Sequence, residues 1–96
     1  MNGARSVGEE ARPRLAPGVV LRHDRARGGW VLLGPERVLV LDDVALEVIR
    51  TCTADQTTVA QGVDRLAKAF DAPRAAIAAD VLDMLNDLRN RGFIIL

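Results

Sequence analysis

The sequence predicts an α+β domain in which a three-stranded antiparallel sheet is followed by three helices. Short apolar runs rich in β-branched residues fill residues 19–41, and apolar residues at helical spacing fill residues 44–88. Gly and Pro separate most of these segments. Because a meander of three short strands buries too little surface alone, we expect the helices to cover one of its faces, in a winged-helix-like arrangement.

The 96 residues fit one domain with a single modest core. Residues 1–17 combine Gly, Pro and charges of both signs with little apolar material. We therefore expect a flexible N-terminal arm over residues 1–17 and the folded domain over residues 18–96. The alternative for the arm is that it packs on a neighbouring molecule.

The first two strands are predicted at residues 19–24 and 30–33, because Gly28-Gly29 between them supplies the positive φ that hairpin turns require. Gly34-Pro35-Glu36 predicts a second tight turn into a third strand, residues 37–41.

This third strand is apolar at four consecutive positions, Val38 to Leu41, which predicts cover on both of its faces. The chain turns helical straight after Leu41, so the strand is expected to remain an edge of the sheet with unpaired backbone groups. One face would meet the core of the domain, and a partner could meet the other.

Asp42 and Asp43 are N-cap candidates for a first helix that ends near Thr53. Thr58 and Gln61 have capping-box spacing and predict the start of a second helix. The apolar stripes of these helices are Val44, Ala45, Val48, Ile49 and Cys52, and Val59, Val63, Leu66, Ala67 and Phe70.

Asp71-Ala72-Pro73 ends the second helix and predicts a third one over about residues 74–91, with Gly92 as its C-cap. The apolar stripe of this helix is Ile77, Val81, Met84, Leu85 and Leu88. The tail, residues 93–96, is apolar and must be buried.

No pattern in the sequence predicts catalysis, a metal site or a cofactor. Glu9-Glu10 and Asp42-Asp43 are adjacent carboxylates, which suits solvent or cap charges better than an acid and base across a substrate. His23 has no second histidine to share a metal, and Cys52 falls on an apolar stripe. Gly28-Gly29 is a turn and no phosphate loop.

The 13 basic and 13 acidic residues cancel, so no net charge attracts nucleic acid or an anionic membrane. The sequence has no apolar signal region and no run long enough to span a bilayer. We expect a cytoplasmic protein.

A set of residues spread over roughly residues 15–95 forms a recognisable pattern: Leu21-Arg22-His23-Asp24, Arg27, Trp30, Leu32-Leu33, Pro35-Glu36-Arg37-Val38-Leu39, Ala45, Ile49, Cys52, Leu66, Phe70-Asp71-Ala72-Pro73, Ile77, Asp80-Val81, Leu88 and Arg91-Gly92. In these residues the sequence resembles the PqqD family of pyrroloquinoline quinone biosynthesis proteins. The family usually carries Asp-Gly after the cysteine, whereas Thr53-Ala54-Asp55 follows Cys52 here.

The resemblance implies a peptide chaperone rather than an enzyme, without a cofactor. Family members bind the precursor peptide PqqA and present it to the radical SAM enzyme PqqE, which crosslinks a Glu and a Tyr of the peptide. In related recognition elements the peptide adds to the sheet edge and lies against the third helix. This implies a peptide-binding site made of Arg37, Val38, Leu39, Val40, Leu41, Val81, Met84 and Leu85.

Each candidate also has a simpler interpretation. The residues of the third helix have the spacing of core residues, and Arg27 and Arg37 could pair with peptide carboxylates or with Asp24 and Glu36.

Two other classes of function compete with peptide binding. A winged-helix DNA-binding protein is disfavoured by Asp80, Asp83 and Asp87, which place an acidic face on the third helix. A structural oligomerisation module would also use an exposed edge. We further expect a homodimer at high concentration, through the edge strand, the arm or residues 93–96.

Overall fold

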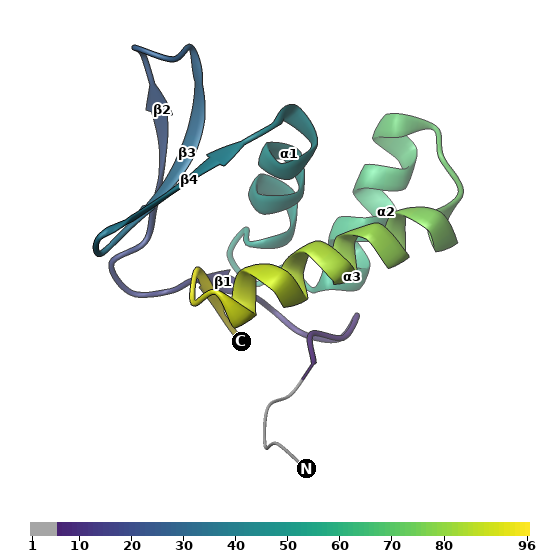
Figure 1. Ribbon diagram of the computed structural model, residues 1–96. Helices are drawn as coiled ribbons and strands as arrows, with labels where there is room; N and C mark the ends of the chain where they lie inside the picture. Colours follow the sequence, from purple (N-terminus) through teal and green to yellow (C-terminus); the bar gives the residue numbers. More distant parts are fainter. Residues whose placement is uncertain (1–5) are drawn as a thin grey trace.

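The computed structural model describes residues 6–96 and confirms the predicted fold class (Figure 1). The three-stranded antiparallel sheet has the order β2-β3-β4, with β2 at Val20–Asp24, β3 at Gly29–Gly34 and β4 at Arg37–Leu41. The helices are α1 at Asp43–Cys52, α2 at Val59–Phe70 and α3 at Arg74–Asn90. A separate antiparallel pair joins β1 at Arg14–Leu15 to β5 at Ile94–Ile95.

The two turns of the meander form where the sequence predicts them. Gly28 has a φ of 73° in the β2–β3 turn, where the Asp24 carboxylate accepts a hydrogen bond of 3.0 Å from the Ala26 N–H. Glu36 has a φ of 58° in the β3–β4 turn, so this turn holds a non-glycine residue in the left-handed region.

Alternation along the strands gives the sheet two different faces. Leu32, Leu39 and Leu41 point toward the helices, and Leu32 is fully buried. Val38 and Val40 point to the opposite face, where they are 59% and 57% exposed. The core therefore covers one face of residues 38–41 as predicted, and the second face, where a partner is expected, is open within residues 6–96.

The N-terminal caps of α1 and α2 are as predicted, whereas the C-cap of α3 is Arg91 and not the predicted Gly92. The Asp42 carboxylate accepts a hydrogen bond of 2.7 Å from the Ala45 N–H, and Thr58 and Gln61 form the complete capping box at the start of α2. Asp71, in the left-handed region, ends α2, and Gly92, with a φ of 83°, follows α3. Each cap satisfies backbone groups that the helix itself leaves unpaired.

After α1 the chain makes a short turn. Thr53 donates its N–H to the Ile49 carbonyl at 3.0 Å, and Gln56 takes a φ of 57°. A further bond of 3.1 Å from the Thr57 N–H to the Ala54 carbonyl closes the turn without a glycine.

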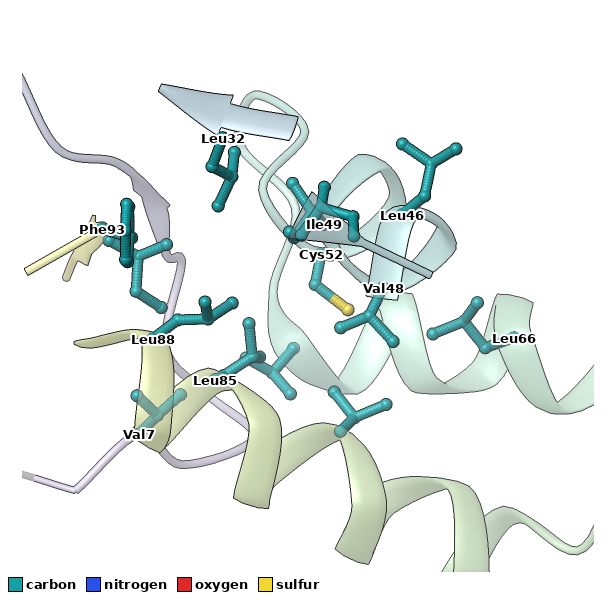
Figure 2. Close-up of a cluster of buried hydrophobic side chains, with 14 of the residues drawn as sticks. Val7, Leu32, Leu46, Val48, Ile49, Cys52, Leu66, Leu85, Leu88 and Phe93 are labelled. Atoms are coloured by element: carbon teal, nitrogen blue, oxygen red, sulfur yellow. The ribbon is translucent and has the colours of Figure 1, made fainter. Parts of the chain in front are cut away.

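The core lies between the sheet and the three helices (Figure 2). Figure 2 shows Leu85 and Leu88 extending from α3 into the cluster that Ile49 and Cys52 enter from α1. Two residues of the predicted apolar stripes do not enter the core: Val44 is 56% exposed and Phe70 is 49% exposed.

The prediction of a flexible arm is wrong for residues 6–17, which pack against the domain; residues 1–5 lie outside the described part. Val7 is buried, and its N–H donates to Asn86 Oδ1 at 2.8 Å. The carbonyls of Glu9 and Ala11 accept the N–H groups of Ala60 and Val59, at 2.8 and 2.9 Å. These are unpaired donors of the first turn of α2, so this segment completes the cap of that helix.

The apolar tail is buried only in its first half, because Ile95 is half-buried and Leu96 is 39% exposed. Phe93 and Ile94 are buried, Ile94 lies opposite Leu15 in the β1–β5 pair, and the Ala16 N–H donates to the Phe93 carbonyl at 3.0 Å. Strand β1 and the C-terminal strand β5 therefore pair beside the C-terminal end of α3 (Figure 1). Within residues 6–96 no helix combines the length and apolar character needed to cross a membrane.

Candidate functional site

Strand β4 is an edge strand that borders only β3 in the described sheet. Gly34 and Arg37 lie opposite each other across a two-residue turn, which makes them a hydrogen-bonded pair of the antiparallel ladder. Such pairs alternate along the ladder, so Leu39, opposite Leu32, directs its N–H and carbonyl toward β3. The backbone groups of Val38 and Val40 consequently point outward from the edge.

A groove runs between this strand and α3, and we call it the β4–α3 groove. Its volume is about 170 Å³, and it is lined by Leu39, Val40, Leu41, Asp42, Ala45, Ile49, Met84, Asp87, Leu88 and Arg91. Seven of the ten lining residues are apolar, and the charged ones include Asp87 and Arg91, which form an ion pair of 3.4 Å on the helix. An extended chain in this groove would meet both outward backbone groups and apolar side chains.

The structure brings four of the eight predicted site residues together in this groove, namely Leu39, Val40, Leu41 and Met84. Val38 lies on the same strand but projects from the open face of the sheet. Leu85 has no exposed surface, so it supports the groove from beneath.

Within the chain, Arg37 contacts other residues than the Glu36 carboxylate that the sequence suggested. Its guanidinium donates to the Arg91 carbonyl and lies 4.7 Å from the centroid of the Phe93 ring. Arg37 therefore satisfies the C-terminal end of α3 and does not pair with Glu36. Sequence reasoning missed this because the partners are 54 residues apart. Arg27, by contrast, pairs with Asp24 at 3.6 Å, which was one of the two alternatives.

A second cavity, which we call the three-helix cavity, opens where α1, α2 and α3 meet. It has a volume of about 160 Å³ and is lined by Val44, Val48, Leu66, Phe70, Ile77, Asp80, Val81 and Met84. Met84 lines both this cavity and the β4–α3 groove, so the two are adjacent along α3. Sequence reasoning missed this cavity, because its lining residues have the spacing of core residues.

The chemistry of the described residues suits binding. Burial raises the pKa of Cys52 to about 11, which keeps the thiol neutral at physiological pH. Within residues 6–96 no three His, Cys, Asp or Glu side chains come together as metal ligands. Arg74 pairs with Glu9 at 2.6 Å and Asp64 at 2.5 Å, and these hydrogen bonds raise its pKa further.

Comparison with known proteins places the chain in a family. The model of the family described as coenzyme PQQ synthesis protein D (PqqD) matches residues 29–94, which include β3, β4 and all three helices. The chain belongs to the PqqD family. The match thus covers both the β4–α3 groove and the three-helix cavity.

Several PqqD relatives carry the name PqqA binding protein. One from Rhodopseudomonas palustris is 46% identical over 93% of this chain and 86% of the relative. Another from Xanthomonas euvesicatoria is 44% identical over 88% of this chain and 91% of the relative.

Two solved PqqD structures have the same fold. The solution structure of the PqqD part of Methylobacterium extorquens PqqCD, described as a functional, stand-alone recognition element for ribosomally synthesized, modified peptides, is 37% identical with a TM-score of 0.70, and covers 88% of each chain. The crystal structure of PqqD from Xanthomonas campestris is 42% identical with a TM-score of 0.52, over 88% of this chain and 93% of the other.

Proposed function

We propose that this protein binds the precursor peptide PqqA by strand addition to β4 and presents it to the radical SAM enzyme PqqE in pyrroloquinoline quinone biosynthesis. The observation that carries the proposal is the open edge of β4, where the backbone groups of Val38 and Val40 point outward and Val40 lines the β4–α3 groove. The PqqA-binding names of its relatives support the choice of peptide.

Strand addition accounts for both affinity and selectivity. Backbone hydrogen bonds to Val38 and Val40 tolerate many sequences, whereas the apolar surface of Leu39 and Met84 selects side chains on one face of the peptide. Ordering a disordered peptide costs about 2 to 5 kcal/mol of the gross interaction, and burial of apolar groove surface offsets this cost. The protein acts here as a chaperone, with no chemical step of its own.

The test is a titration of ¹⁵N-labelled protein with unlabelled PqqA, followed by amide shifts. We expect the largest shifts at Val38, Val40 and Met84, and smaller shifts at higher concentration with a scrambled peptide of the same composition, which keeps the backbone hydrogen bonds but not the side-chain contacts. The other edge strand, β2, is an internal control because no helix groove is found beside it in the described structure. Shifts confined to β2 would overturn the proposed site, and no shifts at all would overturn the function.

Presentation to PqqE needs a separate measurement. We expect PqqE to crosslink the Glu and Tyr of PqqA faster when this protein is present, and a Val40→Pro variant to lose the effect. Equal rates with and without the protein would restrict its role to PqqA binding.

No observation favours the DNA-binding alternative. Asp80, Asp83 and Asp87 are all exposed on α3, where they would repel phosphates. Retention on nonspecific duplex DNA at about 150 mM salt, with a steep salt dependence, would reopen that alternative.

A further inference from the structure

We infer that the three-helix cavity is a second recognition site, which takes one large apolar side chain, of leucine or phenylalanine size, from the peptide bound at β4. This inference rests on the proposed function and adds a specificity pocket to it. We call the inserted peptide residue the anchor.

The lining of the cavity selects an apolar ligand. Seven of its eight lining residues are apolar, and two of them, Val44 on α1 and Phe70 on α2, leave about half of their surface exposed at its mouth. Their spacing in the sequence places both residues on the apolar stripes of their helices, where burial is expected. An inserted side chain would cover the apolar surface that the three helices leave open.

The size of the cavity restricts the ligand to one side chain. Its volume of about 160 Å³ is close to that of an engineered apolar cavity of about 150 Å³ that binds benzene. A phenyl ring or a leucine side chain fits this space, while a helix or a second strand does not.

The position of the cavity connects it to the peptide rather than to another partner. Met84 lines both cavity and groove, and the two follow one another along α3, with Leu88 lining the groove and Val81 lining the cavity. These seven residues of helix correspond to roughly 10 Å, which an extended chain covers in about three residues. The anchor should therefore lie about three residues beyond the segment paired with β4, past Leu41.

Asp80 adds a charge preference to the size preference. It is the one ionisable residue in the cavity lining, and it is exposed at the rim. A carboxylate there repels an acidic side chain at or beside the anchor, and it favours a basic neighbour.

The experiment fills the cavity from its mouth. Val44→Phe places a ring where the anchor would enter, and Val20→Phe is the matched control, since Val20 is 52% exposed against 56% for Val44 and lies on β2, away from the cavity. We expect Val44→Phe to bind PqqA about tenfold or more weakly, the effect of losing one buried apolar side chain, and Val20→Phe to bind like the parent. Val44→Asp should weaken binding as well, and circular dichroism checks that each variant is folded.

A set of PqqA peptides with single alanine substitutions identifies the anchor. Replacing the anchor by alanine should weaken the binding of the peptide to the parent protein about tenfold. The same replacement should change the affinity for Val44→Phe little, because the two positions are coupled in a double-mutant cycle. If the parent binds PqqA and both Val44 variants bind equally well, the anchor site is wrong while the proposed function stands. If the parent does not bind PqqA, the proposed function fails and the anchor site with it.

Discussion

The guanidinium of Arg37 lies 4.7 Å from the centroid of the Phe93 ring and also donates to the Arg91 carbonyl. These two contacts fasten the first residue of β4 to the end of α3. Gly92 makes the approach possible, because a Cβ on this residue would lie 3.3 Å from the guanidinium nitrogens. The Arg37 side chain therefore bridges β4 and α3 at one end of the β4–α3 groove.

Replacing Arg37 should loosen this end of the groove. We expect Arg37→Ala to lower the free energy of unfolding by about 1 kcal/mol, the sum of a partly exposed cation–π contact and one hydrogen bond, and to weaken peptide binding. Arg37→Lys keeps the positive charge but loses the planar guanidinium, so its free energy of unfolding should lie between those of the parent and Arg37→Ala. Urea denaturation measures the loss. Arg22→Ala, on the exposed face of β2, is the control and should have the stability of the parent.

The ladder of β4 predicts opposite effects for two neighbouring prolines. Leu39→Pro removes an N–H directed at β3 and a leucine that packs on the core, so it should unfold the domain. Val40→Pro removes an outward N–H and should leave the domain folded but at least about tenfold weaker in peptide binding.

Circular dichroism and a peptide titration on both variants check this assignment. Val40→Thr keeps the N–H and the branched shape, so it should bind peptide nearly as well as the parent. A folded Val40→Pro variant that binds peptide like the parent would rule out strand addition at this edge.

Gly62 on α2 is packed directly against Cys52 on α1. A Cβ at residue 62 would lie 2.6 Å from Cys52 Sγ, and both residues are buried. We expect Gly62→Ala to destabilise the domain by about 1 to 3 kcal/mol, because this overpacking outweighs the gain in helix propensity of at most about 1 kcal/mol. Cys52→Ala in the same chain should recover much of the loss, which a double-mutant cycle by urea denaturation would measure.

Residues 6–17 should be required for stability. Deleting residues 1–17 exposes the core around Val7 and Pro13 and leaves the first turn of α2 without its acceptors, so we expect a loss of at least about 3 kcal/mol. A smaller version of the test is Asn86→Ala, which removes the bond to the Val7 N–H and should cost about 1 to 2 kcal/mol. Asn90→Ala, at an exposed position of α3, should be neutral. A deletion variant as stable as the parent would instead support the hypothesis that this segment is a flexible arm.

Self-association should depend on the β4 edge. The tail and residues 14–15 pair with each other within one chain, which leaves β4 as the expected contact between two copies. Sedimentation at increasing concentration should show a dimer that PqqA dissociates. A concentration-independent monomer, or a dimer that PqqA leaves intact, would contradict this.

Features that depend on neighbouring residues were predicted from sequence. The Asp42 cap, the Thr58–Gln61 capping box and the Gly28 turn each use groups within four residues, so their spacing in the chain is also their geometry. The packing of residues 6–17 was not predicted, because its hydrogen bonds reach α2 and α3 across about 50 to 80 residues. Composition alone carries no record of such contacts.

The site was predictable to the same degree. The apolar run before Asp42 identified β4 as the edge, and the resemblance added Met84 on α3. Periodicity could not separate Leu85, which is fully buried, from Val44, which is half exposed, because both lie on apolar stripes. The difference arises from how far the helices diverge at each point, which is a property of the packed domain.

The β1–β5 pair has a consequence for the order in which the molecule assembles. It holds only two residue pairs, and each of them closes a loop of about 80 residues, which is costly in chain entropy for so few hydrogen bonds. We expect it to form late in folding and to open before the rest of the domain under native conditions. Phe93 directly precedes β5, and its ring contacts the Arg37 guanidinium. Transient opening of the β1–β5 pair would therefore loosen this contact and, with it, the adjoining end of the β4–α3 groove.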